Sequence, residues 1–136
     1  MATIHRPISG WHPTTPEILA DGFASLAESY PAIAIHFWAQ WNGADPPMDQ
    51  SVQVIARRFT DRVHFVSCDV DCPDNLQLCE RARVATVPTI AVFKKGELQG
   101  TVSGLREPEP LADEIVRLLT TKQTRPVSLW RRLVSF

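Results

Sequence analysis

The sequence predicts an α/β fold built on a mixed β-sheet, and three observations lead to this fold class. A nearly continuous apolar run, AIAIHFW at residues 32–38, is typical of a strand that is buried on both faces. Segments with helical spacing of apolar residues then alternate with β-rich segments, which favours parallel pairing. Near Gly96 two strand-like segments meet at a turn, which indicates an antiparallel hairpin at the edge of the sheet.

The first part of the chain predicts an irregular segment followed by a helix. Residues 1–15 contain prolines and a glycine and show no apolar periodicity. Residues 14–17, TTPE, resemble a helix start, because threonine can cap a helix, proline is tolerated early and glutamate favours the positive end. Apolar residues at helical spacing follow, so we expect a helix over 16–29, ended by the Tyr30-Pro31 pair.

After the first strand, the remaining elements follow from periodicity and turn signals. Helices are expected from apolar stripes and strands from β-branched or aromatic runs. The expected elements are a helix with its stripe at 52–59, a parallel strand at 63–70, a short helix at 73–83, strands at 90–93 and 98–103, and a last helix at 107–121. Residues 122–136 form a basic tail.

Composition excludes several classes of protein. The chain has 136 residues, of which 44% are apolar, and a net charge of −1. This describes one domain with a packed core and argues against a nucleic-acid partner. No apolar run is long enough for a transmembrane helix, and the first 15 residues lack the apolar core of a signal peptide. We therefore expect a cytoplasmic protein, and no feature of the sequence calls for a cofactor.

Three motifs together resemble the thioredoxin fold. They are FWAQW at 37–41 before the second helix, TVPT at 86–89 before a strand, and FKKGE at 93–97 in the hairpin. The resemblance covers residues 16–121 and implies a central mixed sheet flanked by helices, with a C-terminal extension. It also implies a cis-proline at Val87-Pro88.

The loop that carries the chemistry of this family is altered. The family pattern is WCGPC, and this chain has WNGAD, made up of Trp41, Asn42, Gly43, Ala44 and Asp45. Asn42 and Asp45 stand at the two cysteine positions, and neither an amide nor a carboxylate can replace a thiolate nucleophile. We therefore expect no thiol–disulfide exchange at this loop and no catalytic residue there.

Two further positions depart from the family. Thioredoxins usually carry a buried acid where this chain has His36, and often a lysine near Ser67. The segments HFWA at 36–39 and MDQ at 48–50 are similar to the N-terminal thioredoxin-like domain of multidomain monothiol glutaredoxins. That domain often lacks redox cysteines and acts through protein contacts. The chain has no CGFS-type motif, so iron–sulfur binding is not implied.

The altered loop suggests a structural role for its acids. Asp45-Pro46-Pro47 is typical of a helix opening with Asp45 as N-cap, and Asp49 would add negative charge to the first turn. The alternative is that Asp45 is an acid or base, but no Ser, Cys or His stands near it in sequence to form a catalytic pair. Trp41 is either an exposed contact aromatic or packed beneath the loop.

Two segments are candidates for protein binding. The resemblance implies that a peptide-binding groove surrounds five residues, with β-augmentation as its mode; retention for the fold alone is the alternative. These residues are Trp41, Thr86, Val87, Pro88 and Gly104. In the tail, SLWRRLVSF offers Trp130, Arg131 and Arg132 to a partner. Contact of the tail with a membrane surface is less favoured, and packing back on the domain is a further alternative.

The three cysteines support an alternative function. Cys72 with Cys79 or Cys68 could form a redox pair, although two helical turns between Cys72 and Cys79 would separate them by about 10 Å, beyond the roughly 7 Å limit for a disulfide. Otherwise Cys68 and Cys79 are small buried hydrophobes and Cys72 is a surface thiol. His64 and Cys68 lie about 13 Å apart along a strand, so we expect no metal site.

The sequence thus predicts a redox-inactive, thioredoxin-like protein that binds protein partners. It would act as an adaptor or assembly module, for example as a subunit of a larger complex. The alternative is a thiol oxidoreductase or redox sensor in cell redox homeostasis that uses the three cysteines.

Overall fold

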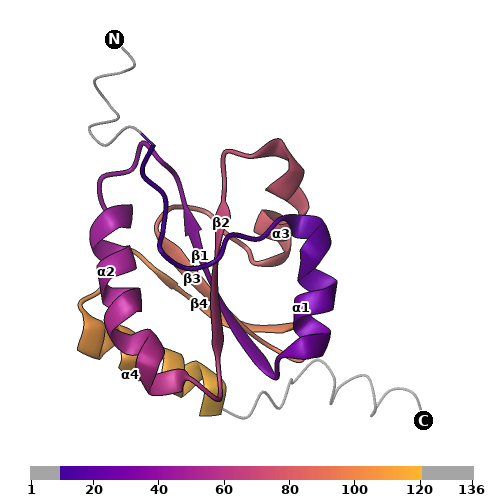
Figure 1. The fold of residues 1–136 in the computed structure, drawn as a ribbon, viewed down its shortest axis with the longest axis vertical. Helices are drawn as coiled ribbons and strands as arrows, with labels where there is room; N and C mark the ends of the chain where they lie inside the picture. The colour runs from indigo at the N-terminus through magenta and orange to yellow at the C-terminus, as the bar shows by residue number, and fades with distance from the viewer. Residues whose placement is uncertain (1–9, 121–136) are drawn as a thin grey trace, which may run out of the picture.

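The computed structural model describes residues 10–120, and Figure 1 shows their fold. Four strands form one sheet in the order β2-β1-β3-β4. β1 is parallel to β2 and antiparallel to β3, and β3 is antiparallel to β4, so the sheet is mixed as the sequence predicted. The strands are β1 (Ala32–Trp38), β2 (His64–Asp69), β3 (Thr89–Lys94) and β4 (Glu97–Ser103).

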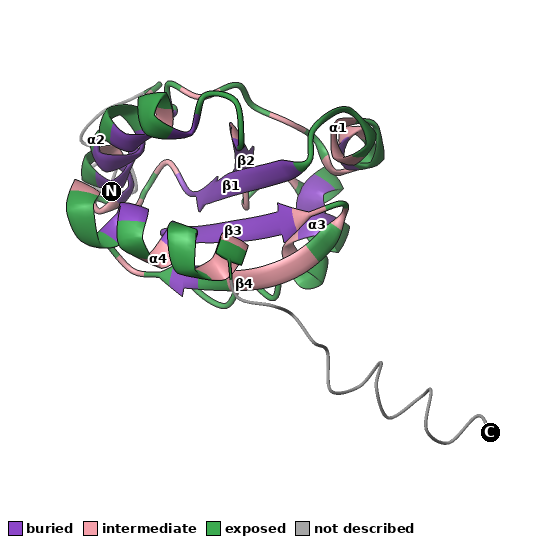
Figure 2. Ribbon diagram, turned by 90° about the horizontal axis from the view of Figure 1, so that it is seen from below, coloured by how far each residue is buried: buried purple, intermediate pink, exposed green. Residues whose placement is uncertain are grey.

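Helices cover both faces of this sheet (Figures 1 and 2). One apolar cluster joins the sheet to α2 and α4, and a second joins it to α1 and α3. The α-helices are α1 (Phe23–Ser29), α2 (Asp45–Ala56), α3 (Leu76–Arg81) and α4 (Pro108–Thr120). Short 3₁₀ turns are η2 (Ala20–Gly22), η3 (Arg57–Phe59) and η4 (Pro73–Asn75). Within the described part, no helix has the length and apolar character to cross a membrane.

β1 is the central element, and the prediction made from its apolar run is confirmed. All seven of its residues are buried, because β2 and β3 flank it and helices cover both faces. Ala34 packs in the cluster on the α2 and α4 side, and Ile35 packs in the cluster on the α1 and α3 side. Alternation along the strand therefore places His36 on the same side as α2, which decides its partner in the site.

The β3–β4 hairpin is also as predicted. Its turn holds Lys95 at φ +51° and Gly96 at φ +80°. Two successive positive φ values are typical of the tight turns that match strand twist, and glycine adopts this conformation without the steric cost of a Cβ.

The helix expected over 16–29 is wrong in its first half. The Ile18 N–H donates to the Ser67 carbonyl at 2.9 Å, and the Ser67 N–H donates to the Pro16 carbonyl at 2.8 Å. The chain there is extended and forms a parallel bridge with β2 at Glu17 and Ser67. This pairing satisfies backbone groups that the outer edge of β2 would otherwise leave open. Helical structure begins only at Ala20, and α1 begins at Phe23.

Residues 10–16, here called the strap, lie against the start of α2 and the end of β1. The rings of Trp11 and Trp38 meet edge to face with centroids 5.5 Å apart. The Gln40 side chain donates to the Trp11 carbonyl at 3.0 Å. Thr14 donates to the Asp49 carboxylate from its backbone N–H at 3.1 Å and from its hydroxyl. The strap thereby covers the polar end of the core beside the altered loop.

Candidate functional site

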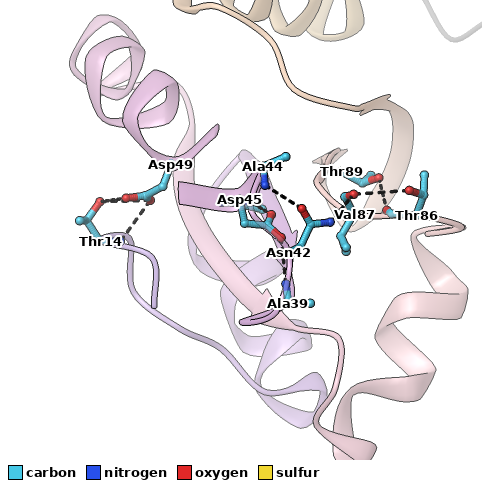
Figure 3. A network of polar contacts seen from close by, with 10 residues as sticks. Thr14, Ala39, Asn42, Ala44, Asp45, Asp49, Thr86, Val87 and Thr89 are labelled. Atoms are coloured by element: carbon cyan, nitrogen blue, oxygen red, sulfur yellow. Dashed lines mark hydrogen bonds and ion pairs between the residues drawn. The ribbon is translucent and has the colours of Figure 1, made fainter. Parts of the chain in front are cut away.

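The altered loop joins the carboxyl end of β1 to α2, and Asn42 fixes its conformation. The Asn42 side-chain oxygen accepts the Ala44 N–H at 2.8 Å, which closes the turn. The Asn42 amide donates to the Val87 carbonyl at 2.9 Å (Figure 3). Asn42 therefore ties the loop to the segment before β3, across a separation of 45 residues in sequence.

Asp45 is not the N-cap that the sequence predicted. It is the first residue of α2, Ala44 holds the N-cap position, and no side chain caps the helix. The Asp45 side chain is fully buried and accepts the Ala39 N–H at 3.0 Å and meets His36 Nε2 at 2.8 Å. Asp45 is directed inward because His36 reaches it from the α2 side of β1, while the loop backbone offers a second donor.

Asp49 is likewise buried, so it is not the exposed helix-end charge that the sequence predicted. Its carboxylate accepts hydrogen bonds from Thr14 of the strap and from Gln53 one turn further along α2, the latter at 3.0 Å. Asp49 thus anchors the strap to the helix.

No Ser, Cys or His stands near Asp45 in sequence, but the fold places His36 beside it. The two side chains are 1% and 0% exposed. Their burial excludes a substrate from this pair in the folded protein, since a general acid or base has to come within hydrogen-bonding reach of the reacting group. The pair therefore serves the fold.

The Val87-Pro88 bond is cis, as the resemblance implied. The Val87 carbonyl accepts Asn42 and, at 3.4 Å, the Thr86 hydroxyl, so internal donors already occupy it. The Gly104 N–H donates to the Pro88 carbonyl at 2.8 Å. The composition of the predicted groove therefore changes. Gly104 holds the proline segment in place and does not line the cavity described next. Val87 does line it, with an apolar side chain and a carbonyl that is already hydrogen-bonded.

A cavity of about 480 Å³ opens beside the altered loop. Two of its lining side chains are largely exposed, Trp41 at 48% and Leu76 at 61%. The Trp41 indole N–H donates to Asp71 at 2.9 Å, which holds this aromatic at the surface rather than beneath the loop. The cavity is lined by Trp41, Asn42, Val70, Leu76, Cys79, Val84, Ala85, Thr86 and Val87.

Sequence reasoning placed three of these residues, Trp41, Thr86 and Val87, in a binding site. It missed Leu76, Val84 and the other residues from α3 and the segment after it. Leu76 gave one signal, because it is one of two leucines in a mostly polar short segment, and the other, Leu78, is buried. The tail candidates Trp130, Arg131 and Arg132 lie outside the described residues.

The structural alternative is confirmed for the burial of Cys68 and is wrong for Cys79, which was expected to be buried. Cys68 is buried on β2, and Cys72 and Cys79 are partly exposed. Burial raises the pKa of the Cys68 thiol strongly, and burial followed by Asp69 raises the pKa of Cys79. The Cys68 side chain acts on the pKa of Cys79, so the pair that the fold brings together is Cys68 with Cys79. Within residues 10–120, no three side chains among His, Cys, Asp and Glu gather to hold a metal ion.

These environments predict an order of thiol reactivity. We expect iodoacetamide at neutral pH to alkylate Cys72 first, Cys79 slowly and Cys68 only on unfolding, because the thiolate is the reactive form and a raised pKa depletes it. Mass spectrometry of tryptic peptides over time measures this order, with the urea-unfolded chain as the control in which all three react alike. Fast native labelling of Cys68 would contradict the expectation.

Comparison with known proteins agrees with this fold. The Thioredoxin family model matches residues 17–117. The chain is 30% identical over 90 residues to a thioredoxin of Rickettsia typhi, covering 66% of this chain and 84% of that protein. It is 33% identical over 91 residues to Monothiol glutaredoxin-S17 of Arabidopsis thaliana, covering 67% of this chain and 18% of that protein.

A protein disulfide-isomerase A3 of Gallus gallus is 34% identical over 110 residues, covering 81% of this chain and 20% of that protein. The chain thus spans about a fifth of the glutaredoxin and of the isomerase. The structure of mitochondrial thioredoxin 3 from Saccharomyces cerevisiae superposes with a TM-score of 0.66 at 26% identity, covering 75% of this chain and 93% of that one. With its cis-proline, its mixed sheet and this match over most of its length, the chain belongs to the thioredoxin family.

Proposed function

We propose that this protein binds other proteins through the cavity beside Trp41 and performs no thiol–disulfide exchange at its WNGAD loop. It acts as an adaptor or assembly module, for example as a subunit of a larger complex. The observation that carries the proposal is an apolar cavity with two exposed large side chains, Trp41 and Leu76, next to a loop without a thiol.

The energetics of exposure support binding at this surface. Burying a leucine side chain contributes about 1.5–3 kcal/mol, and aromatic residues are enriched among the residues that dominate binding. Because Trp41 and Leu76 are largely exposed in the free chain, much of this free energy of burial is still available for binding a partner. Trp41 is also fixed by Asp71, so its ordering on binding costs less entropy than that of a free side chain.

The state of the loop supports the absence of exchange. A thiolate has to attack a disulfide, and a second thiol has to resolve the product. Asn42 and Asp45 hold those two positions, and each is engaged in the fold, Asn42 with Val87 and Asp45 with His36 and Ala39. In this proposal both residues stabilise the fold and take no part in thiol–disulfide exchange.

A second candidate is a thiol oxidoreductase or redox sensor that uses the cysteines outside the loop, since the matched relatives include a thioredoxin and a protein disulfide-isomerase. The contact between Cys68 and Cys79 favours it over a pair that includes Cys72. The raised pKa of both thiols opposes it, because oxidation requires thiolate character. Disulfide reductase turnover that is lost in Cys79→Ser would support this second candidate against the first.

The test of the main proposal combines native size with surface variants. The endogenous full-length protein is sized in a gentle extract, and the proteins that co-migrate with it are identified. Complex formation is then measured with purified partner for Trp41→Ala and Leu76→Ser. The matched control is Val54→Ser on α2, a residue 49% exposed and remote from the cavity.

We expect a stoichiometric complex whose dissociation constant rises at least about tenfold in either cavity variant and stays unchanged in the control, since a contact residue at the centre of an interface contributes more than 1 kcal/mol. A free species near the size of a single chain, or a complex indifferent to both cavity variants, would refute the proposal.

A further inference from the structure

We infer that the cavity beside Trp41 receives a cationic, apolar peptide segment of a partner protein, in which arginine or lysine adjoins a large apolar side chain. The inference rests on the proposed function and adds the chemistry of the partner. It follows from two independent properties of the cavity, which are its apolar lining and the sign of the charges around it.

The lining favours a bulky apolar group. Val70, Leu76, Val84 and Val87 are the large aliphatic residues of the lining, and Asn42 and Thr86 supply polar groups. A volume of about 480 Å³ lies within the roughly 300–1,000 Å³ that ligand pockets occupy. The cavity therefore has room for one or two large side chains of an approaching segment.

The charges around the cavity are acidic. Asp71 binds the Trp41 indole at the cavity, and the Asp71 N–H is held by Asp69. The charged side chains that act on the Cys79 thiol in the lining are Asp69 and Glu80, and both raise its pKa. A thiol at this position therefore experiences negative potential, which would also attract a cation.

The basic side chains at the end of α3 and just after it, Arg81 and Arg83, are directed elsewhere. Arg81 donates to the Gly96 carbonyl at 2.8 Å and stacks over the ring of Phe23. Arg81 and Arg83 together line a separate hollow against β4. They therefore do not neutralise the acidic side chains at the cavity.

An arginine or lysine side chain matches both the apolar lining and the acidic side chains of the cavity. Its aliphatic stem covers apolar surface while the charged head remains near the acids, and a guanidinium can stack on the face of an indole such as Trp41. A neutral apolar segment would gain only the burial, and an acidic one would meet repulsion.

Two synthetic peptides test the inference with the full chain labelled for NMR. The cationic peptide is acetyl-GRLFRG-amide and the charge-reversed peptide is acetyl-GELFEG-amide. At low salt we expect the cationic peptide to bind about tenfold more tightly, as charge complementarity at a rim dictates, with shifts at Trp41, Leu76 and Val84. The preference should shrink at high salt, where exposed charges are screened.

Isosteric variants identify the charges that cause the preference for the cationic peptide. Asp71→Asn keeps an acceptor for the Trp41 indole, and Glu80→Gln keeps the size of the side chain. The double variant should bind both peptides with nearly equal affinity. Asp113→Asn on α4, which removes one negative charge from the other layer of the fold, should keep the preference of the wild type.

Equal binding of both peptides by the wild type would overturn the charge argument and leave the proposed function standing. Failure of both peptides to bind would overturn the inference, while partner binding that still depends on Trp41 would show that the proposed function holds. Nuclear Overhauser contacts between Trp130 and Leu76 in the free full chain would identify the occupant as this chain's own segment, and would also overturn the inference.

Discussion

Replacing Asp45 by alanine is expected to lower the free energy of unfolding by about 3–5 kcal/mol, the cost of removing one member of a buried pair. The Asp45 carboxylate meets His36 Nε2 at 2.8 Å and accepts the Ala39 N–H at 3.0 Å, and its side chain is fully buried. Alanine leaves both groups unpaired in the core, and each buried unpaired group costs about 1–3 kcal/mol. Urea denaturation of the two proteins measures the difference.

Two variants separate this effect from a loss of helix propensity or charge. Asp45→Asn retains an oxygen for the Ala39 N–H and an amide for His36, so it should cost clearly less than alanine. Asp74→Ala removes an exposed acid from the first turn of η4 and should stay within about 0.5 kcal/mol of the wild type, as surface substitutions usually do. A small effect of Asp45→Ala, comparable to that of an exposed cap, would contradict the buried-pair account.

Replacing Asp49 by alanine is expected to lower the free energy of unfolding by about 2–3 kcal/mol, in the range for hydrogen bonds to a charged group. The carboxylate accepts the Thr14 N–H and hydroxyl and the Gln53 amide, and it is 2% exposed. Its loss should act regionally, because Asp49 is the polar anchor between the strap and α2. Denaturant unfolding gives the magnitude, and hydrogen exchange gives the location.

The regional readout distinguishes release of the strap from a general loss of stability. Amide protons of Thr14, Thr15, Glu17 and Ile18 should exchange faster in Asp49→Ala, while those of β1 should change only by the global difference. Thr14→Val, which removes the hydroxyl and keeps the backbone N–H, should show a weaker form of the same pattern. Uniform acceleration throughout the chain would rule out the anchoring role.

The elements that could be predicted from sequence are those whose signal is local. The apolar run of β1 predicts a strand that is covered on both faces, and Gly96 predicts a turn with positive φ values. Each of these features can be read from a few consecutive residues. The start of the helix at 16–29 was wrong because TTPE suits a helix opening as well as an extended segment. The pairing of Pro16 and Ile18 with Ser67 decided between them, and a partner some 50 residues away leaves no trace in the local pattern.

The site was predictable in its chemistry and less so in its geometry. The substitution of Asn42 and Asp45 for cysteines is visible in the sequence. The inward direction of Asp45 is not, because DPP opens a helix whether the acid caps it or turns into the core. Asp45 turns inward because His36, on the adjacent strand, is its hydrogen-bond partner. The cavity joins Trp41 to Leu76 and Val84 from two other segments, and only the fold brings these three together.

The His36–Asp45 pair also couples the substitutions that positions 36 and 45 can accept. A cysteine at position 45 alone would leave His36 unpaired in the core, and an acid at position 36 alone would place two carboxyl groups side by side. Each single change should therefore cost stability, although the double change need not. The two positions are expected to tolerate substitution together more readily than one at a time.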